Sequence, residues 1–173
     1  MRVIFSHGHL SSPSSEKIRR LTPLALDEGW KVEAPDYRPW QDDPHGRVAH
    51  LESRLSANAK PSVLVGSSLG GLVSLAAAEK MPVAGLFLMA PALFMEDRVP
   101  GGVIREAYQP LTGQLCVVHG WQDDIVPPEG SVKFARALGA SLHLLPDDHS
   151  LHASIPTIAG LLQTFLRAVR QAL

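Results

Sequence analysis

The amino-acid sequence predicts an α/β fold, a three-layer α/β/α sandwich around a mostly parallel sheet of about six strands. One observation is that short apolar runs rich in β-branched residues alternate with longer stretches of helical period, the pattern of a parallel sheet covered on both faces. The other is that 173 residues, 45% of them hydrophobic and 19% charged, suit one hydrophobic core. We therefore expect residues 1–173 to form a single domain.

Six short segments have the composition of buried strands. Each is dominated by aliphatic or aromatic residues and is followed closely by glycine, proline or polar residues. The predicted strands span residues 3–6, 31–34, 62–66, 84–90, 114–119 and 141–145.

Five stretches of helical period separate or follow these strands; they span residues 13–28, 44–59, 69–80, 128–138 and 156 to the C-terminus. We expect Ser12 to cap the first helix, with Pro13 at the first position, where a missing N–H costs no hydrogen bond. Pro82 should stop the third helix, and Gly139 should end the fourth. The third helix is apolar around its girth and should be buried, whereas the last has a single apolar side.

Charge and cysteine content exclude several classes of protein. The formal net charge is -1 and the basic residues form no stripe, so we expect no nucleic-acid partner. Cys116 is the only cysteine, which excludes an intrachain disulfide. The N-terminal segment turns polar at Ser6, too early for a signal peptide, and no apolar run approaches the ~20 residues that cross a bilayer. We expect a cytoplasmic protein without a membrane partner, and the oligomeric state stays open.

The most informative segment is Gly66-Ser67-Ser68-Leu69-Gly70, which directly follows a predicted strand and opens a predicted helix. A Gly-x-Ser-x-Gly sequence in this context is typical of a nucleophile elbow, a strained turn that exposes the serine above the sheet. The helix N-terminus would also direct the Leu69 N–H and a positive dipole at a developing oxyanion. The alternative is a flexible turn that merely links strand to helix.

A second informative segment opens the chain: Phe5-Ser6-His7-Gly8-His9-Leu10-Ser11-Ser12-Pro13-Ser14-Ser15. Together with the predicted elbow, it resembles the α/β-hydrolase superfamily, and specifically its small bacterial serine esterases without a cap domain. The resemblance covers nearly the whole chain. It implies a minimal α/β-hydrolase fold, no cofactor, and an oxyanion hole formed by the backbone N–H groups of His9 and Leu69.

The pair His7-x-His9 has a second interpretation as part of a metal site. Two imidazoles at this spacing occur in metallohydrolases, but no further group of potential ligands follows nearby in the sequence. We therefore expect no metal.

A serine hydroxyl needs a base and an orienting carboxylate, and in this fold they follow in the order serine, acid, histidine. The segment His119-Gly120-Trp121-Gln122-Asp123-Asp124-Ile125-Val126-Pro127 resembles the superfamily's His-Gly-x-x-Asp-x-x-Val-Pro sequence. The resemblance selects Asp123 as the acid, with Asp124 in reserve. His119 lies at the end of the predicted strand, and we expect it to be a structural residue. The alternative is an exposed loop whose aspartate caps the next helix.

The base is expected after the sixth strand, where His149 and His152 are the candidates. His149 is preferred because it lies in the loop, whereas His152 lies near the start of the last helix. Gly8, Ser68, Asp123 and His149 each follow a separate predicted strand. Since the carboxyl ends of parallel strands share one edge, we expect all four segments to meet there.

The sequence leads us to expect hydrolysis of small to medium acyl esters, with Ser68 as nucleophile, His149 as base and Asp123 as acid. Only 23 residues, 91–113, separate the fourth and fifth strands, so the site should be open, with apolar walls. Thioesters, lactones and small amides are alternative substrates, and a non-catalytic binding protein of the same fold is the alternative function. The predicted substrate-binding residues are Leu10, Trp40, Phe94 and Trp121.

Overall fold

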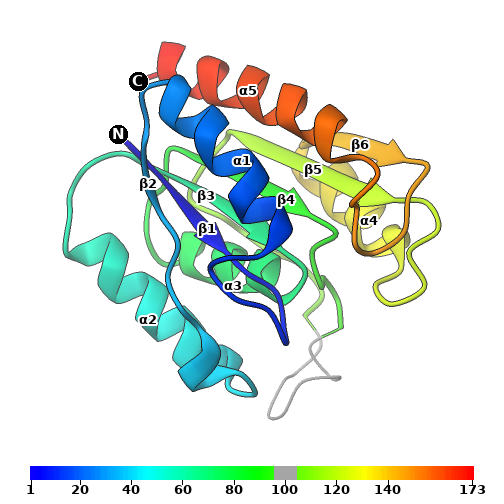
Figure 1. Ribbon diagram of the computed structural model, residues 1–173. Helices are drawn as coiled ribbons and strands as arrows, with labels where there is room; N and C mark the ends of the chain where they lie inside the picture. Colours follow the sequence, from blue (N-terminus) through cyan, green and yellow to red (C-terminus); the bar gives the residue numbers. More distant parts are fainter. Residues whose placement is uncertain (96–104) are drawn as a thin grey trace.

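In the part of the chain that the structure describes, the sheet has six strands, all parallel, in the order β2-β1-β3-β4-β5-β6 (Figure 1). The computed structural model describes residues 1–95 and 105–173. Every end of the predicted strands agrees with the structure to within one residue. The strands are β1 (Arg2–Ser6), β2 (Lys31–Glu33), β3 (Ser62–Ser67), β4 (Gly85–Met89), β5 (Leu115–Gly120) and β6 (Ser141–Leu145).

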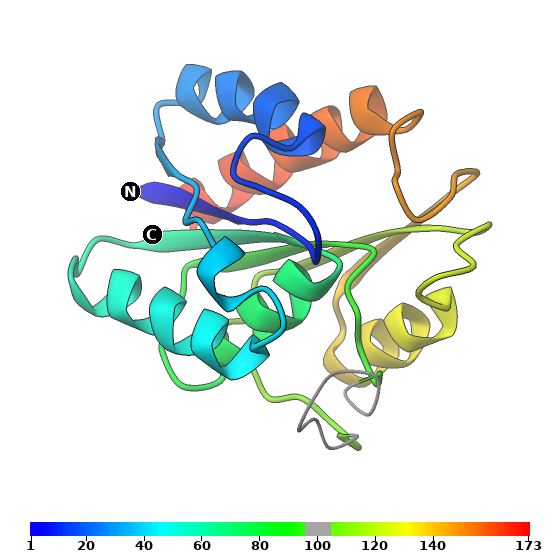
Figure 2. The ribbon, with the colours of Figure 1, turned by 60° about the horizontal axis from the view of Figure 1, so that its bottom comes forward.

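Helices cover both faces of the sheet, which confirms the predicted three-layer sandwich (Figure 2). One face carries α1 (Glu16–Asp27) and α5 (Ile155–Gln171), and the other carries α2 (Pro44–Ser56), α3 (Leu69–Ala78) and α4 (Pro128–Leu138). A short 3-10 helix, η1 (Arg38–Trp40), precedes α2. As predicted, α3 is buried along almost its whole length and α5 buries only one side.

The alternation of side chains along each strand produces two cores, one on each face. In β1, Ile4 packs with residues of α2 and α3, whereas Val3 and Phe5 pack with residues of α1 and α5. All five residues of β1 and of β4 are buried. This burial on both faces explains why the strands are continuous apolar runs rather than alternating ones.

The start of α1 corrects one prediction. The helix begins at Glu16, not at Pro13, and Ser15 is its N-cap residue instead of Ser12. The backbone N–H of Ser15 donates to the Ser12 carbonyl at 3.1 Å, and the Ser14 N–H donates to the Ser12 hydroxyl at 3.2 Å. Ser12 therefore forms a separate turn before the helix, a use of serine that competes with capping.

The other helix ends lie close to their predicted positions or agree with them. Helix α2 ends at Ser56 and α3 at Ala78, both short of the predicted positions. Gly139 ends α4 with a φ of +65°, the left-handed conformation that favours glycine.

Within the residues that the structure describes, no helix is long and apolar enough to span a membrane.

Candidate active site

Ser68 occupies a strained turn between β3 and α3. Its φ of +53° and ψ of -123° lie outside the regions open to most residues and cost on the order of 1–3 kcal/mol. The turn is possible because Gly66 and Gly70, two residues before and two after Ser68, have no side chain. A Cβ on Gly66 would lie 2.5 Å from the Gly70 carbonyl oxygen, and a Cβ on Gly70 would overlap the carbonyl oxygen of Ser6.

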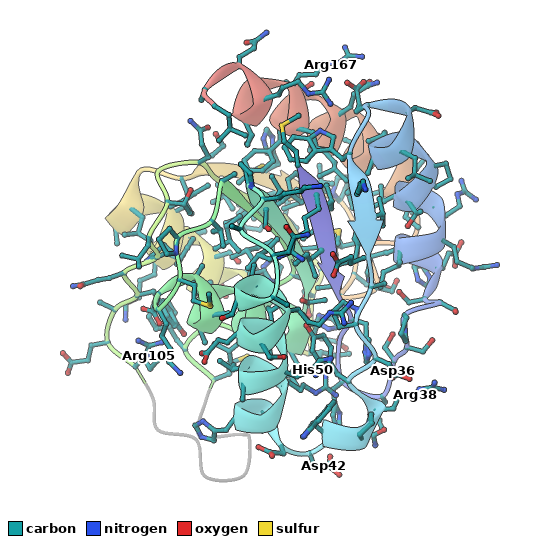
Figure 3. All side chains as sticks on the ribbon, turned by 90° about the vertical axis from the view of Figure 1, so that its left-hand side faces the viewer. Asp36, Arg38, Asp42, His50, Arg105 and Arg167 are labelled. Carbon is teal, nitrogen blue, oxygen red and sulfur yellow. The ribbon has the colours of Figure 1, made fainter. Side chains whose placement is uncertain are left out.

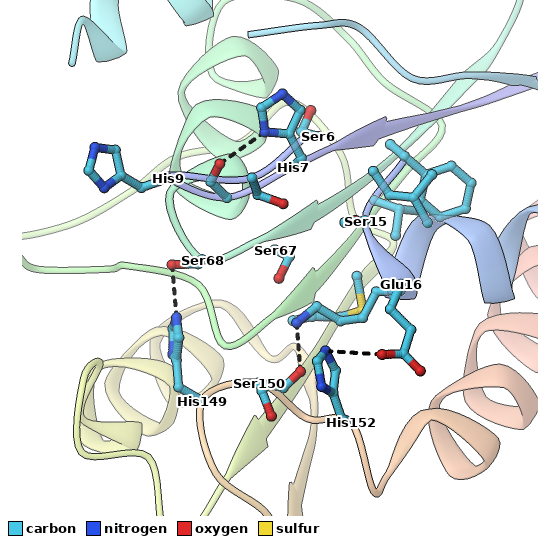
Figure 4. Close-up of a pocket in the computed structure, with 17 residues that line it drawn as sticks. Ser6, His7, His9, Ser15, Glu16, Ser67, Ser68, His149, Ser150 and His152 are labelled. Carbon is cyan, nitrogen blue, oxygen red and sulfur yellow. Dashed lines mark hydrogen bonds and ion pairs between the residues drawn. The ribbon is translucent and has the colours of Figure 1, made fainter. Parts of the chain in front are cut away.

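Three side chains from distant parts of the chain meet at this turn. The Ser68 hydroxyl lies 3.0 Å from Nε2 of His149 (Figure 4), and Nδ1 of His149 lies 2.7 Å from Oδ2 of Asp123. Because Asp123 is a hydrogen-bond acceptor, it selects the tautomer in which His149 carries its proton on Nδ1. Nε2 is then free to accept the proton of Ser68.

The Asp123 carboxylate is buried and held on both oxygens. Oδ1 accepts hydrogen bonds from the backbone N–H groups of Ile125 at 3.0 Å and Val126 at 2.8 Å, so the loop closes around the carboxylate. Oδ2 faces His149, and only 6% of Asp123 is exposed. Asp124, the reserve candidate, is exposed. The structure thus brings Asp123, and not its neighbour, to His149.

His119 contacts the same carboxylate and was assigned only a structural role from the sequence. Its Nε2 lies 3.0 Å from Asp123 Oδ2 and 2.9 Å from the Val126 carbonyl, and its Nδ1 lies 2.7 Å from the Ser131 hydroxyl. Burial lowers the pKa of His119, which favours the neutral ring. The neutral ring donates from Nε2 and accepts from Ser131. The four-residue spacing from His119 to Asp123 was the only sequence signal for this contact.

His7 is buried and orients the loop that follows β1. Its Nδ1–H donates to the Gly8 carbonyl at 2.9 Å (Figure 4). Its Nε2 accepts a hydrogen bond from the Tyr37 N–H at 3.0 Å. In a trans peptide the C=O and the next N–H point in opposite directions. The His9 N–H is therefore directed away from the side on which His7 holds the Gly8 carbonyl. Gly8 packs against Ser68, since a Cβ on Gly8 would lie 3.4 Å from Ser68 Cβ.

Arg47 of α2 strengthens this orientation. Its Nη1 donates to the carbonyls of His7 and Gly8 at 3.4 and 3.3 Å, and its other nitrogens donate to the carbonyls of Trp40 and Gln41 at 2.9 and 3.1 Å. The side chain is fully buried, and in the described part of the chain no carboxylate lies within 4.0 Å of it. Burial accordingly lowers its pKa. No sequence signal pointed to Arg47, because arginine is usually exposed.

The other candidate histidines point elsewhere. Nε2 of His9 lies 2.9 Å from the carboxylate of Asp42, which lies between η1 and α2 (Figure 3). Nε2 of His152 lies 3.7 Å from Glu16 and is exposed. Both ring nitrogens of His7 are occupied by hydrogen bonds, and the described residues contain no cluster of three histidine, cysteine, aspartate or glutamate side chains suited to a metal ion.

A cavity of about 190 Å³ opens beside Ser68, between the start of α1 and the loop that carries His149. Apolar side chains, among them Phe5, Val65 and Met89, line part of it. The predicted wall was apolar, but polar groups form much of this lining; they include Ser11, Ser15, Glu16, Lys17, Ser67 and Ser150.

The four predicted substrate-binding residues do not line this cavity. Leu10 and Trp121 are 75% and 57% exposed. Trp40 stacks on His50, with 4.7 Å between ring centroids, and Phe94 packs on Tyr108 at 4.9 Å. Trp40 thus packs η1 against α2, and Phe94 packs two loop segments together. Sequence alone does not distinguish such packing from ligand binding. Residues 96–104 of the predicted wall lie outside the described residues.

The sequence matches the model of the uncharacterised protein family UPF0227 over residues 2–136. No curated protein is a significant match.

Solved structures share the fold. A proposed hydrolase of the α/β superfamily from Xanthomonas campestris is 27% identical, with a TM-score of 0.82 over 96% of this chain and 98% of its own. An α/β serine hydrolase without a lid, also from Xanthomonas campestris, is 21% identical, with a TM-score of 0.74 over 96% and 81%. Est1E from Butyrivibrio proteoclasticus is 15% identical, with a TM-score of 0.83 over 98% and 88%. The chain therefore has the α/β-hydrolase fold.

Proposed function

This chain belongs to the uncharacterised protein family UPF0227, and from the geometry of its site we propose that it is a serine hydrolase that cleaves carboxylic esters. One observation carries the proposal: the continuous contact from Ser68 Oγ through His149 to Asp123, at 3.0 and 2.7 Å. The proposal is supported by the 27% identical structure from Xanthomonas campestris, itself a proposed hydrolase.

The reaction begins when His149 accepts the proton of Ser68 and the serine oxygen attacks the ester carbonyl carbon. Asp123 stabilises the imidazolium that forms. The carbonyl oxygen becomes an oxyanion, which accepts hydrogen bonds from the N–H of Leu69, at the start of α3, and the N–H of His9. One such donor is worth about 10²–10³-fold in kcat.

Collapse of this intermediate breaks the bond to the alcohol, which leaves with the proton from His149. Ser68 then carries the acyl group. A water molecule, deprotonated by His149, attacks the acyl-enzyme through a second oxyanion, and the acid product leaves as the serine regains its proton. The cavity of about 190 Å³ favours small to medium substituents on the ester.

Labelling with a fluorophosphonate tests this proposal, because the reagent reacts with activated serines. We expect one modification on the wild-type protein, none on Ser68→Ala, and retained modification on Ser67→Ala, which removes the neighbouring hydroxyl. Hydrolysis of 4-nitrophenyl acetate, butyrate and octanoate should favour the shorter esters and be lost with Ser68→Ala. An unmodified wild-type protein that cleaves none of the esters would contradict the proposal.

A further inference from the structure

Lys17 extends from the first turn of α1 to the loop that carries the proposed base. Its Nζ donates a hydrogen bond to the Ser150 carbonyl at 2.6 Å, one residue beyond His149. Lys17, Ser68 and His149 all line the cavity described above. Figure 4 labels the residues around it, with Ser68 next to His149, and Glu16 next to His152. The cavity therefore places a cationic side chain beside the reacting groups.

The charge of Lys17 has no carboxylate partner among the described residues, where none lies within 4.0 Å of the ammonium. The nearby carboxylates are engaged elsewhere. Glu16 faces His152 at 3.7 Å, Asp123 accepts from His149, and Asp148 accepts from the Ser150 N–H at 2.8 Å. Burial lowers the pKa of Lys17, and these carboxylates together with Asp147 oppose that effect.

An ammonium group has three donors, and the Ser150 carbonyl takes one. A neutral, apolar substituent in the cavity would displace water from the remaining donors without replacing its hydrogen bonds, which costs free energy. A carboxylate would accept these donors in charge-assisted hydrogen bonds, which are stronger than neutral ones. The polar lining supplied by Ser11, Ser15 and Ser67 also suits a hydrated or charged group.

We propose that Lys17 makes this protein selective for esters that carry a free carboxylate a few atoms from the scissile bond. This inference rests on the proposed ester hydrolysis and adds the class of substrate. The carboxylate takes no part in bond making. It binds the ammonium while Ser68 attacks the ester carbonyl, so it contributes to kcat/KM through positioning.

The test compares esters that differ only in charge. The first pair differs on the acyl side: monoethyl glutarate carries a carboxylate, and ethyl glutaramate carries a neutral amide. The second pair differs on the alcohol side: 4-acetoxybutanoate carries the carboxylate, and 4-acetoxybutanamide carries the amide. Product formation is followed by proton NMR at neutral pH. We expect kcat/KM to favour the carboxylate by about tenfold or more in one pair, the equivalent of about 1.4 kcal/mol. The preferred pair identifies which part of the ester enters the cavity.

Variants then assign the preference to Lys17. The readout is the carboxylate-to-amide ratio within each variant, because Lys17 also contacts the loop of His149 and its loss would affect both esters of a pair. Lys17→Met should bring the ratio close to one, and Lys17→Arg should retain most of it. Lys31→Met is the matched control: it removes an exposed lysine at the opposite end of the strands and should keep the wild-type ratio.

The possible failures are distinguishable. The inference is overturned if the wild-type protein hydrolyses the two amide-bearing esters as well as it hydrolyses the two carboxylate-bearing esters. It is also overturned if Lys17→Met keeps the wild-type carboxylate-to-amide ratio. Both outcomes leave the proposed ester hydrolysis intact. If the wild-type protein hydrolyses none of the four esters but its Ser68 still reacts with a fluorophosphonate, the inference is overturned and the proposed function is not. Absence of both turnover and labelling overturns the proposed function itself.

Discussion

The Nε2 atom of His119 lies 3.0 Å from Oδ2 of Asp123, the oxygen that also accepts from His149. His119 is fully buried, and its other ring nitrogen contacts the hydroxyl of Ser131, which is buried as well. A chain of hydrogen bonds therefore runs from Ser131 in the core, through His119, Asp123 and His149, to Ser68. Such a chain restricts the carboxylate to one orientation.

Replacing His119 should lower activity beyond its effect on stability. His119→Leu removes the donor to Asp123 and leaves Ser131 without its acceptor, so kcat should fall by about tenfold or more, the equivalent of about 1.4 kcal/mol or more. Ser131→Ala breaks only the far end of the chain and should have a smaller effect. Steady-state kinetics and urea unfolding of each variant provide the comparison. Unchanged kcat in a destabilised His119→Leu protein would leave His119 with a structural role only.

Substitutions of Asp123 and of its neighbour Asp124 should have different effects on kcat. In Asp123→Asn the amide can donate to His149 and favours the wrong tautomer, so we expect kcat to fall by about 10³–10⁴-fold, as for the acid of other triads. Asp124→Asn removes the same charge from an exposed side chain and should change kcat by less than about twofold. Equal losses in the two variants would show that charge in the loop, rather than contact with His149, matters.

Much of the fold and of the candidate site follows from one regularity of the sequence. Each strand is a short apolar run, and Gly8, Ser68, Asp123 and His149 each come just after one of them. Parallel strands end at a common edge, so the meeting of these residues could be predicted without side-chain coordinates. The preference for His149 over His152 also agrees with where the structure places the two rings.

The features that the sequence did not reveal depend on contacts between distant segments. Arg47 is an ordinary polar residue in the sequence of α2, and only the packing of α2 against the loops after β1 and β2 buries it. The cavity beside Ser68 is formed by the start of α1, which begins three residues later than its proline suggests. Aromatic residues were predicted to bind substrate; in the structure Trp40 and Phe94 pack on the rings of His50 and Tyr108 and do not line this cavity.

Arg47 gives a prediction in which stability and catalysis change together. Arg47→Met leaves buried carbonyls without a donor and should reduce the free energy of unfolding by roughly 2 kcal/mol or more. Because the Gly8 carbonyl is then held by His7 alone, we expect kcat to fall about tenfold with little change in KM. Arg20→Met, on the exposed side of α1, is the control for loss of charge. A stable Arg47→Met protein with wild-type kcat would contradict this role.

The buried histidines predict loss of stability in acid. Burial lowers the pKa of His7 and of His119 below the ordinary value of 6.5, so the unfolded chain binds protons at a pH where the folded chain does not. The free energy of unfolding should therefore be highest above about pH 6.5 and decrease as the pH falls below it, until the folded rings also protonate. Urea unfolding at several pH values should show a shallower decrease for His7→Asn than for the wild type. His45→Gln, in an exposed part of α2, should keep the wild-type slope.

Two glycine-to-alanine substitutions should have opposite effects. At Gly70 the new methyl group would overlap the backbone carbonyl of Ser6 and lie 2.6 Å from that of His7. Neither carbonyl can rotate away without moving β1, so Gly70→Ala should displace the turn at Ser68 from the loop that follows β1. We expect a large loss of activity and destabilisation of a few kcal/mol.

At Gly160, in α5, nothing lies within 4 Å of a new Cβ, and alanine has the higher helix propensity. Gly160→Ala should therefore raise the free energy of unfolding by about 0.5–1 kcal/mol without changing kcat. Thermal unfolding and kinetics of the two variants, made in parallel, compare the same chemical change in a crowded and an open position. Because only the surroundings differ, equal effects at the two sites would contradict the close approach of α3 to β1 on which the nucleophile turn depends.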